Sequence, residues 1–147
     1  MTRQDYQDTL RRVLDAHTDT ALRTLAGLFP RLPEKAREIQ FGIFPDQDGE
    51  GTFSVVIGLD GPDLYVLNKA IDGYRHVFDV VHGEIGVAPR VPLFRDEPDF
   101  CVQDAIADTA ADWIEALWEQ GGRAVSPLPA CILSLIHISE PTRQEAI

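Results

Sequence analysis

The residues with the clearest chemical potential form the stretch DQDGEGTFS, residues 46–54, where carboxylates recur at alternate positions. Asp46, Asp48 and Glu50 match the first three ligand positions of a twelve-residue calcium-binding loop. The match stops at the twelfth position, where Ile57 stands in place of the bidentate glutamate. Asp and Gly are also the residues of a hairpin tip. A solvated turn is therefore the leading interpretation, and a weak metal site with Asp46, Asp48 and Glu50 as ligands is the alternative.

Two histidines form the second candidate site. His76 and His82 lie in residues 74–83, a segment that alternates as a strand does. Their separation is even, so both imidazoles are expected on the same face, where a neighbouring carboxylate would create a metal or acid–base site. Asp79 falls on the opposite face, and nothing completes the ligand set that zinc requires. We therefore expect both histidines to be structural.

Catalytic motifs are otherwise missing from the sequence. Cys101 opens a predicted helix, but no nucleophile elbow surrounds it and no acid–histidine pair stands beside it. No phosphate-binding loop or dinucleotide fingerprint occurs either. We expect no cofactor, and the enzyme hypothesis is left without a motif.

An acidic row runs along the segment 100–120, on the side opposite its apolar stripe. Its members are Asp104, Asp108, Asp112, Glu115 and Glu119, and no Lys or Arg lies between residues 96 and 122 to pair with them. Trp118 falls toward an edge of this helix, where an aromatic side chain can anchor a partner. The predicted partner-binding residues are Asp104, Asp108, Asp112, Glu115 and Trp118. The alternatives are a solvated helix face and a tryptophan packed under a loop.

The composition limits the kinds of partner. The chain of 147 residues has 13 basic and 24 acidic residues, a net charge of −11, which repels phosphate backbones and anionic membrane surfaces. A basic protein partner is favoured instead, as in immunity proteins that neutralise basic toxins. Two cysteines are too few for a disulfide framework, and the N-terminus lacks the apolar run of a signal peptide, so we expect a cytoplasmic protein.

The periodicity of apolar residues predicts an α+β fold. Helices are expected at about 3–28 and 100–120, from spacings of three and four, and a β-hairpin at 37–59, from alternation on both sides of a turn. A short helix should follow Pro62, and residues 74–83 should form a third strand. We predict a single two-layer domain with a small antiparallel or mixed sheet of three to four strands packed against the two long helices.

Two segments carry a family resemblance. FPDQDGEGTFSVVIGLDGPDLYVLNKAI (residues 44–71), with the later DTAADW (residues 108–113), resembles small bacterial proteins classed as a family of unknown function. The resemblance implies a bacterial, cytoplasmic origin and no particular activity. The leading functional hypothesis is a non-enzymatic protein-binding module, immunity-like or regulatory. The alternative is a small hydrolase or metal-dependent enzyme near Asp46–Glu50 or His76/His82.

The C-terminal stretch LSLIHISEPTR, residues 133–143, resembles the in-frame translation of a sequencing-library adapter, and residues 144–147 fit its continuation. The alternative is a natural amphipathic strand. We therefore expect residues 1–132 to form one native domain, truncated at its C-terminus. Residues 133–147 are expected to be a non-native tail that packs little against that domain.

Overall fold

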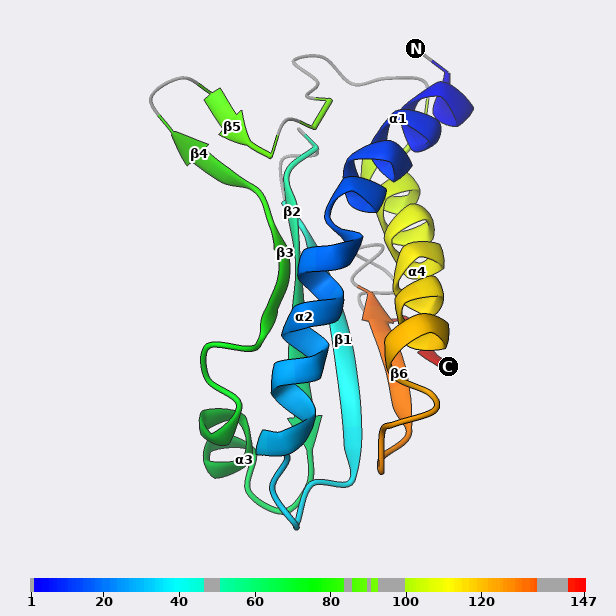
Figure 1. Cartoon of the computed structure of the whole chain (residues 1–147). Helices are drawn as coiled ribbons and strands as arrows, with labels where there is room; N and C mark the ends of the chain where they lie inside the picture. Colours follow the sequence, from blue (N-terminus) through cyan, green and yellow to red (C-terminus); the bar gives the residue numbers. More distant parts are fainter. Residues whose placement is uncertain (1, 47–50, 84–85, 90, 93–99, 135–142) are drawn as a thin grey trace.

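The β-hairpin predicted from alternating apolar residues is the centre of the fold (Figure 1). In the computed structural model, β1 (Glu38–Pro45) pairs antiparallel with β2 (Phe53–Asp60), and Phe41 lies opposite Ile57. Inward residues of both strands are buried and alternate with more exposed ones, which gives the sheet one apolar face. The structure describes residues 2–46, 51–83, 86–89, 91–92, 100–134 and 143–147.

Further strands extend this hairpin into a mixed sheet of order β3-β2-β1-β6-β7. β3 (His76–Asp79) pairs antiparallel with β2, β6 (Ala130–Ser134) runs parallel to β1, and β7 (Arg143–Ala146) is antiparallel to β6. A separate small hairpin joins β4 (Val81–Gly83) to β5 (Gly86–Ala88). The predicted mixed sheet of three to four strands is confirmed up to β6, and β7 adds a fifth strand at its edge.

The described helices are α1 (Arg3–Ala16), α2 (Thr18–Leu28), the short 3-10 helix η1 (Phe29–Arg31), α3 (Leu64–Ala70) and α4 (Val102–Gly121). α2 and α4 pack against strands of the sheet, α1 packs on α4, and α3 lies beside β2. The α+β architecture is confirmed. No described helix combines the length and the apolar character needed to cross a bilayer.

The first predicted helix is interrupted, which the sequence pattern did not indicate. α1 begins at a capping box, where the Thr2 hydroxyl accepts from the Asp5 backbone N–H, and it ends at His17, whose φ and ψ of −100° and 2° are not helical. The indole N–H of Trp113 donates to the Thr18 hydroxyl at 3.1 Å, and the His17 ring packs edge-on against Phe78. These tertiary contacts fix the break, so one continuous helix over 3–28 is wrong.

Both tryptophans of α4 pack against aromatic residues of the sheet. Trp113 meets the Phe78 ring at a centroid distance of 6.1 Å, and Trp118 meets Phe41 at 5.9 Å. Trp118 is only 3% exposed, so its predicted role as an exposed anchor for a partner is wrong. It is a core residue, because Phe29 and Phe41 cover it from two sides. Gly122 lies against the Trp118 ring, and a Cβ at this position would come within 2.2 Å of a ring atom. A larger residue there would displace the indole.

The C-terminal segment also departs from expectation. β7 pairs with β6 over four register positions, and the Ile147 N–H donates to the Ala130 carbonyl at 3.0 Å. Ile147 also packs, partly buried, against the core. The expectation of little packing is therefore wrong for residues 143–147. The non-native origin of residues 133–147 stays a prediction.

Replacing Trp118 with Ala should lower the free energy of unfolding by about 3–5 kcal/mol, because it leaves a large cavity between Phe29 and Phe41. Chemical denaturation measures this value. Trp118→Phe keeps most of the apolar volume and should lose clearly less. Equal stability of the alanine variant and the unaltered chain would contradict this placement.

Candidate functional site

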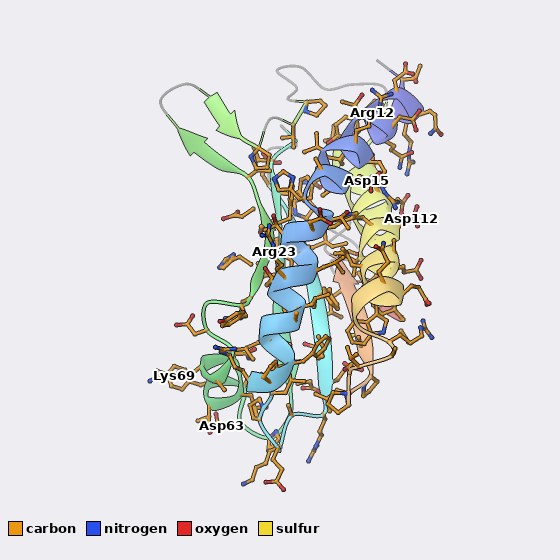
Figure 2. All side chains as sticks on the ribbon, viewed as in Figure 1. Arg12, Asp15, Arg23, Asp63, Lys69 and Asp112 are labelled. Carbon is orange, nitrogen blue, oxygen red and sulfur yellow. The ribbon has the colours of Figure 1, made fainter. Side chains whose placement is uncertain are left out.

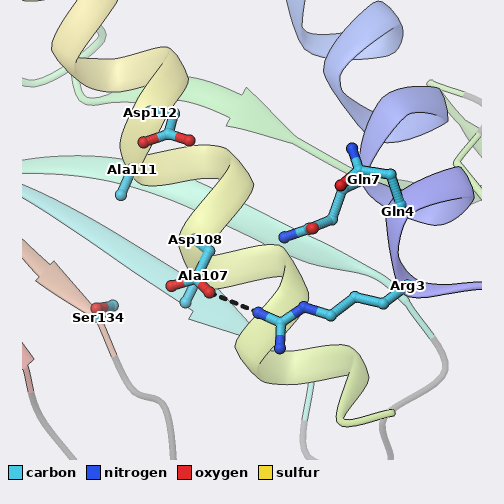
Figure 3. A pocket seen from close by; sticks show the side chains of 8 residues that line it. All are labelled: Arg3, Gln4, Gln7, Ala107, Asp108, Ala111, Asp112 and Ser134. Carbon is cyan, nitrogen blue, oxygen red and sulfur yellow. Dashed lines mark hydrogen bonds and ion pairs between the residues drawn. The ribbon is translucent and has the colours of Figure 1, made fainter. Parts of the chain in front are cut away.

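The candidate site is a cleft of about 600 Å³ between α1 and α4, next to the end of β6 (Figure 3). Its lining residues are Arg3, Gln4, Gln7, Ala107, Asp108, Ala111, Asp112 and Ser134. α1 supplies the basic and amide side chains, and α4 supplies the two carboxylates. The cleft thus contains two of the predicted partner-binding residues, Asp108 and Asp112.

An ion pair joins the two helices inside this cleft. The Arg3 guanidinium donates to Asp108 Oδ2 at 2.6 Å, and both side chains are 44% exposed. No Lys or Arg lies between residues 96 and 122, and the cation that pairs with the acidic row comes instead from α1, at the start of the chain. A second cation, Arg123, pairs with Glu119 at 2.6 Å, beyond the end of α4.

Small residues make the cleft possible. Ala107 and Ala111 lie one helical turn apart on α4 and line the cleft between the two carboxylates and β6. Their short side chains leave space that larger residues would fill. Gln7 reaches from α1 to the Ala105 carbonyl at 3.5 Å, and Gln4 donates to Asp8 on α1 itself.

The acidic row continues outside the cleft along α4. Asp112, Glu115 and Glu119 are exposed, whereas Asp104 and Asp108 are half-buried. Figure 2 shows Asp112 on the outer side of α4, away from Lys69 on α3. The exposed carboxylates Asp112 and Glu115 form no ion pair with any described residue, so the outer end of the cleft is negatively charged.

The predicted metal loop lies only partly within the described residues. Asp46 is described, and Asp48 and Glu50 lie outside that range. The Thr52 hydroxyl donates to Asp46 Oδ2 at 2.9 Å, and the Gln103 amide donates to the Asp46 carbonyl at 2.6 Å. Asp46 Oδ1 is buried and accepts no hydrogen bond from the described residues. Through these hydrogen bonds Asp46 connects the end of β1 to Thr52, just before β2, and to Gln103 on α4.

Tyr6 lies close to this end of the hairpin. Burial, followed by the negative charge of Asp46, raises the pKa of the Tyr6 hydroxyl far above its usual value. Its ring packs at 5.6 Å from Phe100. Burial therefore favours the neutral phenol, and the Tyr6 ring is part of the core.

The two histidines do not share a continuous strand. Residues 74–83 divide into β3 and β4, which belong to different sheets, so the predicted single third strand is wrong. A register shift between Val55 and Val56 of β2 disturbs the alternation opposite β3. As a result His76 is exposed while Phe78 is buried. The side chain of His82 lies outside the described residues.

A hollow of about 190 Å³ near Asp46 also fails to join the two predicted enzyme sites. It is lined by Phe44, Asp46, Thr52, Phe53, Ser54, Asp79 and Val80, without His76. Across the part of the chain that the structure describes, no group of three or more His, Cys, Asp or Glu residues could hold a metal ion. Cys101 is exposed at the start of α4.

The residues that sequence reasoning missed are those that α1 contributes: Arg3, Gln4 and Gln7. No local pattern distinguishes them, because their importance comes from packing against a helix 105 residues away in the chain. The pair Ala107 and Ala111 was visible as small residues on α4, but their spacing alone is equally typical of close helix packing.

The chain belongs to a family of unknown function (DUF6389), whose model matches residues 1–135. No curated protein and no solved structure matches the chain.

The Arg3–Asp108 pair should contribute little to stability. Both groups are about half exposed, so solvent screens the attraction, and Arg3→Gln or Asp108→Asn should change the free energy of unfolding by less than about 1 kcal/mol. A double-mutant cycle in urea isolates the pair. A coupling energy above about 2 kcal/mol would contradict this and make the pair a structural clamp.

The loop at Asp46 should bind calcium no better than roughly millimolar, because Ile57 occupies the position of the bidentate glutamate. Isothermal titration calorimetry with calcium checks this. Asp46→Asn serves as the control, since it keeps the shape of the side chain and removes its charge. Micromolar binding that Asp46→Asn abolishes would revive the metal-site hypothesis.

Proposed function

We propose that this protein is a non-enzymatic binding module that recognises a basic segment of another protein at the cleft between α1 and α4. The observation that carries the proposal is the placement of Asp108 and Asp112 together in a cleft of about 600 Å³ whose outer end is negatively charged. A cytoplasmic location and an immunity-like or regulatory role fit this proposal.

The cleft suits an arginine or lysine side chain. Its volume lies within the range of sites for small ligands, and its carboxylates lie in one wall above Ala107 and Ala111. The exposed carboxylate of Asp112 can accept two parallel hydrogen bonds from a guanidinium. Asp108 already binds Arg3, which shows that the wall accommodates such a group.

Charge supports the same partner class. The chain carries a net charge of −11, and Asp112 and Glu115 extend the negative surface along α4. A field of one sign accelerates the association of an oppositely charged partner and makes the rate depend on salt. The described residues that line the cleft include no histidine and no cysteine, so among them binding is better supported than nucleophilic or imidazole-based catalysis.

Peptides selected on the unaltered chain from a random displayed library should be enriched in arginine and lysine. For a selected peptide, Asp108→Asn with Asp112→Asn should reduce the association rate constant by about tenfold or more at low salt, because steering is lost. The Asp108 change also frees the positive charge of Arg3 in the cleft. Surface plasmon resonance measures the rate, and circular dichroism verifies the fold.

The matched control is Asp60→Asn with Asp72→Asn, which removes the same charge from exposed positions at the end of β2 and after α3. This control should retain most of the association rate. If both double variants lower the association rate constant equally, the loss reflects the net charge of the chain and not the cleft. A selection without basic enrichment would refute the proposed function.

A further inference from the structure

Exposed apolar side chains gather on α3, on the side of the molecule away from the acidic cleft. Among the described residues, the large apolar side chains that are exposed are Phe44, Leu64, Tyr65, Val66 and Val125. Three of them are consecutive at the start of α3, where Leu64 is 56%, Tyr65 75% and Val66 58% exposed. Single exposed apolar residues are ordinary on a protein surface, whereas a contiguous group indicates an interaction site.

The orientation of α3 is fixed from its inner side. Leu67 and Ile71 are buried in the core, and Asn68 Oδ1 accepts from the Leu59 backbone N–H of β2 at 2.8 Å. Asp63 caps the helix, because its carboxylate accepts a backbone N–H of the first turn at 3.2 Å. The sheet and the cap together hold the exposed residues of α3 in one orientation.

A hollow of about 490 Å³ lies beside these exposed residues. It is lined by Leu64, Tyr65, Asn68, Lys69, Asp72 and Arg75. The Nε–H of Arg75 donates to the Ile57 carbonyl at 2.8 Å, which positions its guanidinium. Neither Lys69 nor Arg75 forms an ion pair with a described residue. The hollow therefore combines two cations with an aliphatic and an aromatic side chain.

Tyr65 and Lys69 make this surface complementary to itself. They are four residues apart on α3, so they lie on one face, and the Lys69 Nζ is 5.8 Å from the centre of the Tyr65 ring. When two copies of α3 pack antiparallel about a twofold axis, Tyr65 of each copy lies opposite Lys69 of the other. An ammonium group over an aromatic face is attractive, and the symmetry forms this contact twice.

The charges along α3 favour the same antiparallel arrangement. Asp63 stands at the start of the helix, while Lys69, Asp72 and Arg75 lie at or beyond its end and sum to one positive charge (Figure 2). Antiparallel packing brings the negative start of each α3 to the positive end of the other copy, whereas parallel packing would place like charges together. Asp72 in the hollow can also accept the phenol O–H of the incoming Tyr65.

From this complementarity we propose that α3 is a self-association surface, at which a second copy of this chain docks antiparallel and inserts its Tyr65 into the hollow beside Lys69 and Arg75. The occupant is a second copy because one surface supplies both the exposed ring and the groups that receive it. The inference is independent of the proposed function, since it uses no residue of the acidic cleft. α3 and α4 lie on opposite sides of the molecule, so the clefts of both copies stay open (Figure 1).

The size of the surface sets the expected strength. A helix of seven residues presents less than the roughly 800 Å² per partner that a stable interface buries, so the dimer should be weak, with a dissociation constant on the order of 0.1 mM. Sedimentation velocity of the full chain, from about 10 µM to about 1 mM, brackets this value. The weight-average sedimentation coefficient should rise over that range.

Variants of Tyr65 test the contact itself. Tyr65→Ser should weaken dimerisation at least tenfold, because it removes the inserted ring, and Tyr65→Phe should lose clearly less, because it removes only the O–H. The matched control is Val125→Ser, which removes an apolar side chain of similar exposure, 64%, between α4 and β6 and should leave dimerisation unchanged. Circular dichroism verifies the fold of each variant.

A chain that stays monomeric at about 1 mM would overturn the inference and leave the exposed group to a different protein. Equal dimerisation of Tyr65→Ser and Val125→Ser would also overturn it, because another surface would then join the copies. The register has its own measurement, an isotope-filtered NOE experiment on a mixture of labelled and unlabelled chains. Contacts between the Tyr65 ring of one copy and the Lys69 side chain of the other are expected, and their absence in a dimeric sample would overturn the antiparallel arrangement.

Discussion

The packing of the two α4 indoles on the aromatic face of the sheet fixes the positions of the other functional elements. Trp113 and Trp118 meet Phe78 and Phe41 in edge-on arrangements. Each buried indole removes on the order of 200 Å² from water, or about 5 kcal/mol before conformational entropy is subtracted. This contact sets the rotation of α4 about its axis, so that Asp112 and Glu115 point outward. Every acidic residue of the candidate site takes its direction from that rotation.

α1 converts an acidic helix face into a shaped site. The break at His17 separates α1 from α2, and α1 packs along α4 while α2 packs on both α4 and the sheet. Arg3 then reaches Asp108, and the small side chains of Ala107 and Ala111 leave the cleft open beside it. An isolated helix with the same carboxylates would be only a solvated surface. The cleft exists because a second helix forms its other wall.

The two ends of the sheet differ in the regularity of their strand pairing. β3 is short, its pairing with β2 contains a register shift, and both features discourage edge-to-edge association. β6 is regular over five residues, and it is parallel to β1 on one side and antiparallel to β7 on the other.

Local regularities of the chain were enough to predict the hairpin and the inner stripe of α4. Each depends on a period of two or 3.6 residues, and such signals are written in consecutive residues. The sequence likewise identified Asp108 and Asp112 as members of an acidic row. Tertiary structure alone decided that Trp118 is buried, that the first helix breaks at His17, and that residues 74–83 divide between two sheets. It also brought Arg3 to Asp108 across 105 residues of chain, because partners so distant in sequence meet only when the fold has packed their helices together.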